Sequence, residues 1–180
     1  SILMNQQKMN LDDVKNLMVL YDDFPIPGQQ FRDVSPILNN PAAMQAIRSK
    51  LFEQWQNKGI TKVLLPESMS YFFGTMLACD LNCGIVMARK EGKLPGKVLK
   101  VNYFLNYKMK NEGMEIEEGL ISENDVVLIL DDAVSSGSTC NAIKTMLSQI
   151  GVKTVYMAFL FQIDSQGFKL SEKEQVIWHF

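Results

Sequence analysis

The sequence predicts an α/β fold in which a mostly parallel, twisted sheet carries helices on both faces. Short apolar runs recur along the chain, and segments of helical periodicity separate them. The runs are continuous rather than alternating, as expected for strands that are buried on both faces of a sheet. Residues 97–118 break this rhythm with a period-two pattern, which indicates a small antiparallel flap or hood inserted between sheet strands.

The N-terminal part is expected to contain two helices separated by a loop. Residues 10–20 have the periodicity of a short amphipathic helix. In "YDDFPIPGQQFRDVSPIL", three prolines and one glycine indicate an ordered, irregular loop. A longer helix then begins with Asn40 as N-cap and Pro41 at its first position, and ends near Gly59. Its apolar residues at helical spacing are assigned to the core: Ala43, Ile47, Leu51 and Trp55.

The remaining chain is expected to supply five sheet strands and two more helices. The predicted strands are, in order, "KVLL", "IVMA", "VVLILDD", "TVYMAFLF" and "QVIWHF". Gly84 is expected to close the helix "SYFFGTMLACDLNCG", and Gly151 the helix from about Thr139 to Ile150. Within the flap, residues 110–113 have the composition of a turn.

Composition restricts the classes of function. The chain's 180 residues suit one domain that spans residues 1–180. Its 18 basic and 20 acidic side chains give a net charge of −2, which argues against nucleic acid or a membrane surface as the main partner. The N-terminus has no signal-peptide pattern and no apolar run reaches spanning length, so a cytoplasmic protein is expected.

The cysteines do not form a metal-binding pattern. Cys79 and Cys83 are spaced to share a helix face, but Cys140 is distant in sequence and the single His179 lies next to the C-terminus. Structural zinc sites use four such ligands. We therefore expect free thiols in a reducing compartment and no structural zinc.

The stretch "VVLILDDAVSSGSTCNAI" carries the clearest chemical signal. Its apolar strand ends in Asp131 and Asp132, and ligands of open α/β sheets bind beyond the carboxyl ends of the strands. Small and hydroxylated residues then lead into a helix N-terminus, where backbone N–H groups and the helix dipole favour an anion. We call them the phosphate loop: Ser135, Ser136, Gly137, Ser138 and Thr139.

A ligand with a phosphate and a nearby cis-diol fits both features. Two carboxylates repel a phosphate placed on them, but they accept hydrogen bonds from vicinal ribose hydroxyls or hold Mg²⁺ through water. A 5-phosphoribosyl group has this chemistry. The alternatives are an aspartate pair that only caps a turn, and a P-loop, whose pattern G-x-x-x-x-G-K-[ST] is absent.

Several stretches together resemble the type I phosphoribosyltransferases, and adenine phosphoribosyltransferase in particular. "VLILDDAVSSGST" is similar to that family's motif for phosphoribosyl pyrophosphate (PRPP), and "DFPIPGQQFRDVSPIL" resembles its base-binding segment, within a hood region of about residues 10–40. "GITKVLLPES" leads into the pyrophosphate loop, and "ARKEGKLPG" resembles the flexible loop. "YFLNY" lies where the family has Tyr-x-Leu-Glu-Tyr.

The resemblance implies a type I phosphoribosyltransferase core and a purine-salvage enzyme. The family transfers 5-phosphoribosyl from PRPP to N9 of adenine, giving AMP and pyrophosphate, with Mg²⁺ bound to PRPP; its members usually form homodimers. Carried over, Asp131 and Asp132 hold the ribose hydroxyls and the phosphate loop binds the 5′-phosphate. The residues implied for pyrophosphate are Arg89, Lys90, Lys93, Glu67 and Ser68, and among them Arg89 and Lys90 are expected to be catalytic.

The flexible loop has support from its own residues. It places Arg89, Lys90 and Lys93 in a segment with glycine and proline, which suits a mobile lid over a polyanionic leaving group. The alternative is a solvated run of charges. The base pocket is implied for Gln30, Phe31 and Arg32; Phe31 packing in the core, or Arg32 pairing with a carboxylate, are the alternatives.

The chain departs from the family pattern at three places. The pyrophosphate loop reads Glu-Ser-Met69-Ser70 instead of Glu-Ser-Arg-Gly, which removes a cation from a loop that often contains a non-proline cis peptide. Asn106 replaces the hood glutamate at a catalytic position, and an amide is no general acid or base near neutral pH. Lys108 and Ser138 each replace a glycine.

These departures leave three functions open. The first is an adenine phosphoribosyltransferase whose efficiency depends on Met69, Ser70 and Asn106. The second is a phosphoribosyltransferase for another purine-like base. The third is a weakly active regulatory protein that binds nucleotide or PRPP.

Overall fold

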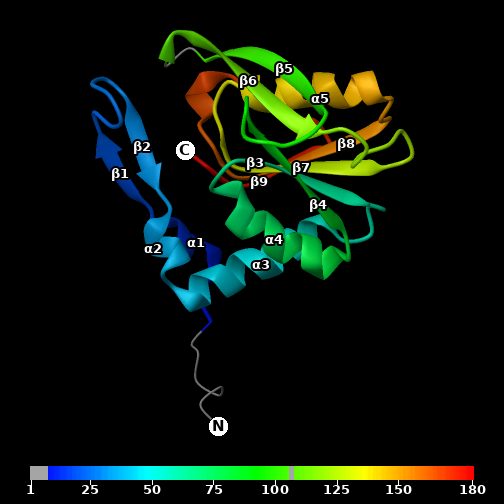
Figure 1. Ribbon diagram of the computed structural model, residues 1–180. Coiled ribbons are helices and arrows are strands. Elements are labelled where there is room, and N and C mark those ends of the chain that lie inside the picture. The colour runs from blue at the N-terminus through cyan, green and yellow to red at the C-terminus, as the bar shows by residue number, and fades with distance from the viewer. Residues whose placement is uncertain (1–7, 106–107) are drawn as a thin grey trace. The chain divides into compact units, whose positions relative to one another are not determined.

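The computed structural model describes residues 8–105 and 108–180, which divide into two compact units, residues up to Glu53 and residues from Gln54 onward (Figure 1). The prediction that residues 1–180 form a single domain stays a prediction. Across the described ranges, every helix is too short or too polar to cross a membrane.

The first unit begins with a helix that is shorter than expected. Helix α1 covers only Leu11–Lys15, and the Asn10 side chain caps it by accepting a hydrogen bond from the Asp13 N–H at 2.8 Å. Residues after Asn16 instead form strand β1, Val19–Asp22, which pairs antiparallel with β2, Gln30–Asp33. The prediction of a helix to residue 20 is wrong because this ladder, formed with residues distant in sequence, overrides the local periodicity.

The expected irregular loop is also wrong in part, because it contains this β-hairpin. The hairpin turn has a cis peptide bond between Phe24 and Pro25, and Gly28 has a φ of 86°. The Asp23 carboxylate accepts a hydrogen bond from the Gly28 N–H at 2.8 Å. Helix α2, Ser35–Leu38, follows with a proline in its first turn.

Helix α3, Pro41–Trp55, confirms the predicted N-cap. The Asn40 side chain accepts a hydrogen bond from the Ala43 N–H at 3.1 Å. The helix ends four residues before Gly59, and the chain then turns through left-handed conformations at Asn57 and Gly59. The apolar residues assigned to the core are all buried: Ala43, Ile47, Leu51 and Trp55.

The second unit is built on a sheet whose strand order, among the described residues, is β5-β6-β4-β3-β7-β8-β9 (Figure 1). Strands β4, β3, β7, β8 and β9 are parallel, whereas β5 and β6 pair antiparallel and join the sheet through β6 and β4. The bounds are β3 Lys62–Pro66, β4 Gly84–Lys90, β5 Val98–Leu105, β6 Lys110–Glu117, β7 Val126–Val134, β8 Thr154–Gln162 and β9 Glu174–His179. The mostly parallel sheet and the antiparallel flap are confirmed.

The turn predicted within the flap is misplaced. Residues 110–113 belong to β6, where Gly113 pairs with Asn102 and Lys110 pairs with Leu105. The reversal therefore falls between Leu105 and Lys110. Asn106 and Tyr107 lie outside the described residues.

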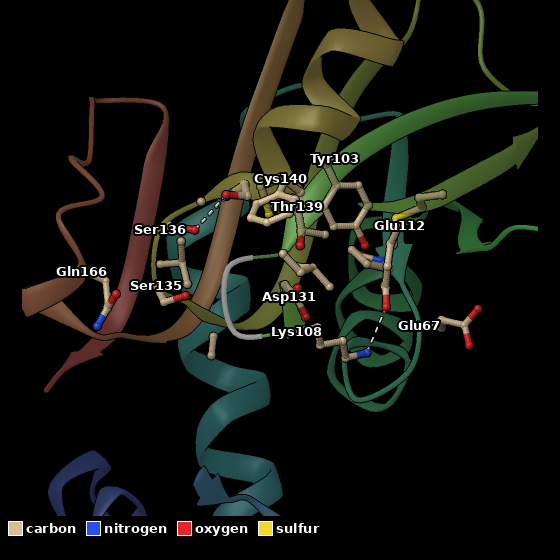
Figure 2. A pocket seen from close by; sticks show the side chains of 18 of the residues that line it. Glu67, Tyr103, Lys108, Glu112, Asp131, Ser135, Ser136, Thr139, Cys140 and Gln166 are labelled. Carbon is tan, nitrogen blue, oxygen red and sulfur yellow. Dashed lines mark hydrogen bonds and ion pairs between the residues drawn. The ribbon is translucent and has the colours of Figure 1, made fainter. Parts of the chain in front are cut away.

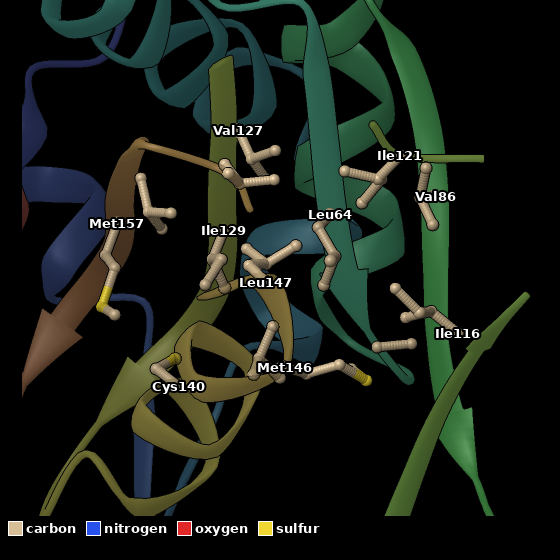
Figure 3. Packing of buried hydrophobic residues seen from close by; sticks show 14 of the residues in the cluster. Leu64, Val86, Ile116, Ile121, Val127, Ile129, Cys140, Met146, Leu147 and Met157 are labelled. Carbon is tan, nitrogen blue, oxygen red and sulfur yellow. The ribbon is translucent and has the colours of Figure 1, made fainter. Parts of the chain in front are cut away.

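Helices α4, Ser70–Leu81, and α5, Ser138–Ile150, cover opposite faces of the sheet, as predicted (Figure 1). Asn82 rather than Gly84 closes α4, with a φ of 56°, while Gly151 closes α5 as expected. The core under α5 is apolar (Figure 3), and its residues include Leu64, Val86, Val127, Ile129, Ile143, Met146 and Leu147. This packing holds the start of α5 against the carboxyl end of β7.

Candidate active site

A pocket of about 340 Å³ opens at the carboxyl ends of the parallel strands in the second unit (Figure 2). Its walls come from the end of β3, the end of β7 with the loop into α5, and the flap strands β5 and β6. The site follows from the topology, because parallel strands bring their carboxyl ends to one edge of the sheet.

The phosphate loop forms one wall of this pocket, and all five of its residues line it. Gly137 is the N-cap of α5 with a φ of 83°, and a β-carbon there would meet the Phe168 ring at 2.2 Å. The Ser136 and Ser138 hydroxyls lie 2.9 Å apart within hydrogen-bond distance. The backbone N–H groups of the first turn of α5 have no carbonyl partner within the helix, so the loop offers an anion several donors.

The two predicted acidic residues differ in position. Asp131 lines the pocket, and its carboxylate accepts a hydrogen bond from the Asp132 N–H at 2.9 Å. Asp132 is the next residue on the strand and is not among the lining residues. Burial, together with the adjacent Asp132 carboxylate, raises the pKa of Asp131 well above its usual value. A hydroxyl donor or a divalent cation arriving here would relieve this repulsion.

The pyrophosphate loop contains the expected non-proline cis peptide, between Glu67 and Ser68. Glu67 lines the pocket, whereas Ser68 and Met69 are exposed and do not. Ser70, which stands in place of a family glycine, is completely buried at the start of α4, and its hydroxyl donates to the Pro66 carbonyl. The loop therefore accommodates Ser70 without an unsatisfied hydroxyl.

Glu67 binds the end of strand β4. Its carboxylate accepts a hydrogen bond from the Lys90 N–H at 2.7 Å and lies 3.4 Å from Arg89 Nε. Of the three predicted flexible-loop cations, only Lys90 lines the pocket. Lys93 is exposed, and Arg89 joins Glu67 in an ion pair.

The flap contributes pocket residues that the sequence did not indicate as site residues. Tyr103, Lys108 and Glu112 line the pocket, and Lys108 Nζ lies 3.0 Å from Glu112 Oε1 (Figure 2). Their spacing of four residues is compatible with an ion pair, but only the hairpin turns both toward the pocket. Gln166 also lines it, from a 3₁₀ turn at Asp164–Gln166 that no motif indicates.

The predicted base-binding residues belong to the first unit, on strand β2. Gln30 donates from its side chain to Asp22 at 3.0 Å, and the Phe31 ring meets Phe24 edge-to-face with centroids 5.2 Å apart. Burial lowers the pKa of Arg32. Phe31 is 41% exposed, which argues against the alternative that it is an ordinary core residue of this unit. Asn106 lies outside the described residues.

Comparison with known proteins agrees with a site for a phosphoribosyl group. The family described as the phosphoribosyl transferase domain matches residues 33–177. The adenine phosphoribosyltransferase of Phocaeicola vulgatus is 40% identical over 141 residues, covering 78% of this chain and 80% of the relative. The chain belongs to the adenine phosphoribosyltransferase family. The relative from Idiomarina loihiensis is 35% identical over 86% of each chain.

Solved structures of this family have the same fold. The adenine phosphoribosyltransferase of Giardia lamblia, complexed with 9-deazaadenine, superposes with a TM-score of 0.91 at 30% identity, covering 96% of this chain and 99% of the other. The enzyme from Rhodothermus marinus gives a TM-score of 0.86 at 31% identity, covering 94% and 97%. These comparisons confirm the predicted family, fold class and enzyme type.

Proposed function

We propose that this chain transfers 5-phosphoribosyl from PRPP to N9 of adenine in purine salvage, giving AMP and pyrophosphate. The observation that carries the proposal is that one pocket is lined both by the phosphate loop and by Asp131. A phosphoribosyl group has an anion and a cis-diol at matching positions. Its relatives named adenine phosphoribosyltransferase support adenine as the acceptor.

The phosphate loop is assigned to the 5′-phosphate. The helix α5 begins with Ser138, Thr139 and Cys140. The backbone N–H groups of these first residues have no acceptor within the helix. The hydroxyl pair of Ser136 and Ser138 adds donors at the same wall. Binding the phosphate here holds C1′ in a constant position, which is how positioning accelerates a displacement.

The carboxylates are assigned to the ribose hydroxyls and to the charge that develops on the sugar. Loss of pyrophosphate leaves positive charge at C1′ and the ring oxygen, and a nearby anion stabilises it. The neighbouring oxygens of Asp131 and Asp132 also fit a hard cation through water, since Mg²⁺ prefers oxygen ligands and keeps several waters. Mg²⁺ that accompanies PRPP would neutralise the leaving pyrophosphate.

The remaining assignments concern the leaving group and the base. Lys90 faces the pocket and is assigned to pyrophosphate, while Arg89 holds Glu67 and so orients the pyrophosphate loop. Gln30, Phe31 and Arg32 are assigned to the adenine, and Asn106 to its polar edge. A cytoplasmic homodimer completes the proposal, on the strength of the resemblance.

A four-base assay tests this function. The protein is incubated with PRPP, Mg²⁺ and adenine, hypoxanthine, guanine or xanthine, and pyrophosphate release is measured. We expect release with adenine and very little with the other three. Release with hypoxanthine but not adenine would select the second function. No pyrophosphate release with any base, together with tight AMP binding, would overturn the proposal that the protein is an enzyme.

A further inference from the structure

We propose that Lys108 is a binding residue for the pyrophosphate group of PRPP and replaces the cation that the pyrophosphate loop lacks at Met69. The inference rests on the proposed function. It concerns a position at which the sequence departs from its family, since Lys108 stands in place of a glycine.

PRPP carries an anion at each end, and the phosphate loop accounts for only one of them. The second needs cations, yet Met69 is apolar and 40% exposed, and neither Arg89 nor Lys93 lines the pocket. Among the described lining residues, the cationic side chains are Lys90 and Lys108.

The Lys108 side chain is held in place by its surroundings. Glu112 is 10% exposed and accepts the Lys108 ammonium at 3.0 Å, while Lys110 reaches the same carboxylate at 3.7 Å from outside the pocket. Burial would raise the pKa of Glu112, but the hydrogen bond and charge of Lys108, with the charges of Lys90 and Lys110, bring this pKa below its usual value. Glu112 is therefore ionised near neutral pH.

The Lys108 ammonium thus lies at the pocket in contact with an ionised carboxylate, and the charge of Lys90 acts on the same carboxylate. Glu112 restricts the rotamers of Lys108 and keeps its ammonium at the pocket (Figure 2). A prepositioned ammonium loses less side-chain entropy when an anion binds. The flap therefore places a prepositioned ammonium group in the pocket that the phosphate loop also lines.

The deciding variant is Lys108→Met, with Lys110→Met as the matched control, because Lys110 contacts the same carboxylate but does not line the pocket. We expect Lys108→Met to raise the KM for PRPP and the Kd of pyrophosphate about 10- to 100-fold, the size of one charge-assisted contact. Lys108→Arg should recover most of this loss. Lys110→Met should change the KM for PRPP and the Kd of pyrophosphate by no more than about two-fold, because it removes only an exposed ion pair.

AMP is the internal control, since it lacks pyrophosphate. Its Kd should change by no more than about two-fold in Lys108→Met, because the 5′-phosphate lies at the other wall. An equal loss of AMP affinity, or equal effects of the two lysine variants, would overturn the inference. Titration of pyrophosphate by calorimetry tests Lys108 even if the four-base assay shows no turnover, so the two proposals fail separately.

Discussion

The Phe168 ring lies so close to Gly137 that a β-carbon at position 137 would come within 2.2 Å of Phe168 Cδ2. Gly137 also has a φ of 83°, in the left-handed region that favours glycine. Two independent constraints, one of backbone and one of packing, therefore require glycine at the start of α5. The phosphate loop takes its shape from both.

We expect Gly137→Ala to weaken AMP binding at least about 10-fold and to destabilise the fold by about 2–5 kcal/mol, the sum of a left-handed residue and an overpacked site. Gly151→Ala is the control. Gly151 also has a left-handed φ, 94°, but a β-carbon added there would lie 3.4 Å from its nearest contact, Glu123 Cβ. It should lower the melting temperature and leave AMP binding intact. Calorimetric titration and thermal melts measure both; normal AMP binding by Gly137→Ala would contradict the assignment.

Asp131→Asn should raise the melting temperature of the protein without ligand, and by more at high pH than at low pH. The pKa of Asp131 is raised in the folded state. Its favourable contribution to the free energy of unfolding is therefore complete below the unfolded-state pKa, about 3.9, and is lost as pH rises through the folded-state pKa. The variant's gain in melting temperature should therefore be largest at pH 8 and shrink toward pH 4, while its PRPP binding weakens.

Asp125→Asn provides the opposite case. Burial favours a higher pKa for Asp125, but hydrogen bonds from the Ser122 N–H and the Thr61 hydroxyl, both 2.8 Å long, lower it overall. Its contribution is present above the unfolded pKa and lost as pH falls through the folded value, so this variant should melt lower at pH 8. Melting curves that move the same way for both variants would rule out the assignment for Asp131.

The thiols should differ widely in reactivity. Burial, then the charges of Asp131 and Asp132, raises the pKa of Cys140 well above its usual value, and the side chain is 2% exposed. Cys79 is exposed. With an aromatic disulfide reagent at pH 8, we expect Cys79 to react first and Cys140 only after denaturation. An unchanged initial rate in Cys79→Ser would refute this order.

Asn106→Glu tests whether the amide is a weakened catalytic position. Restoring a group that exchanges protons should raise the rate with adenine, by at most about 10²–10⁴-fold, the usual contribution of general acid–base catalysis. Asn111→Glu, a substitution elsewhere in the flap, is the control and should leave the rate near that of the parent protein. Steady-state kinetics at saturating PRPP give the answer; an unchanged or lower rate would mean that Asn106 has a role of its own.

The sequence alone determined the parallel sheet, the motif at its carboxyl edge and the family. Short continuous apolar runs rich in β-branched residues, such as residues 126–130, are typical of strands buried in a parallel sheet. Asn40, Gly137 and Gly151 carry local conformational requirements that can be read one residue at a time. The phosphate loop was predictable for the same reason. Its donors belong to consecutive residues, so they are close together in any fold, although the packing of Phe168 against Gly137 helps to set the shape of the loop.

Tertiary structure decided the features that join distant residues. The ladder of β1 and β2 took the last residues of a predicted helix, because its hydrogen bonds depend on pairing across a turn. Lys108, Glu112 and Gln166 became pocket residues only because the fold brings the flap and the 3₁₀ turn to the pocket at the end of β7. The burial of Ser70 also depends on packing, although its hydrogen bond to Pro66 is local. Proximity of this kind depends on long-range packing, which no local pattern encodes.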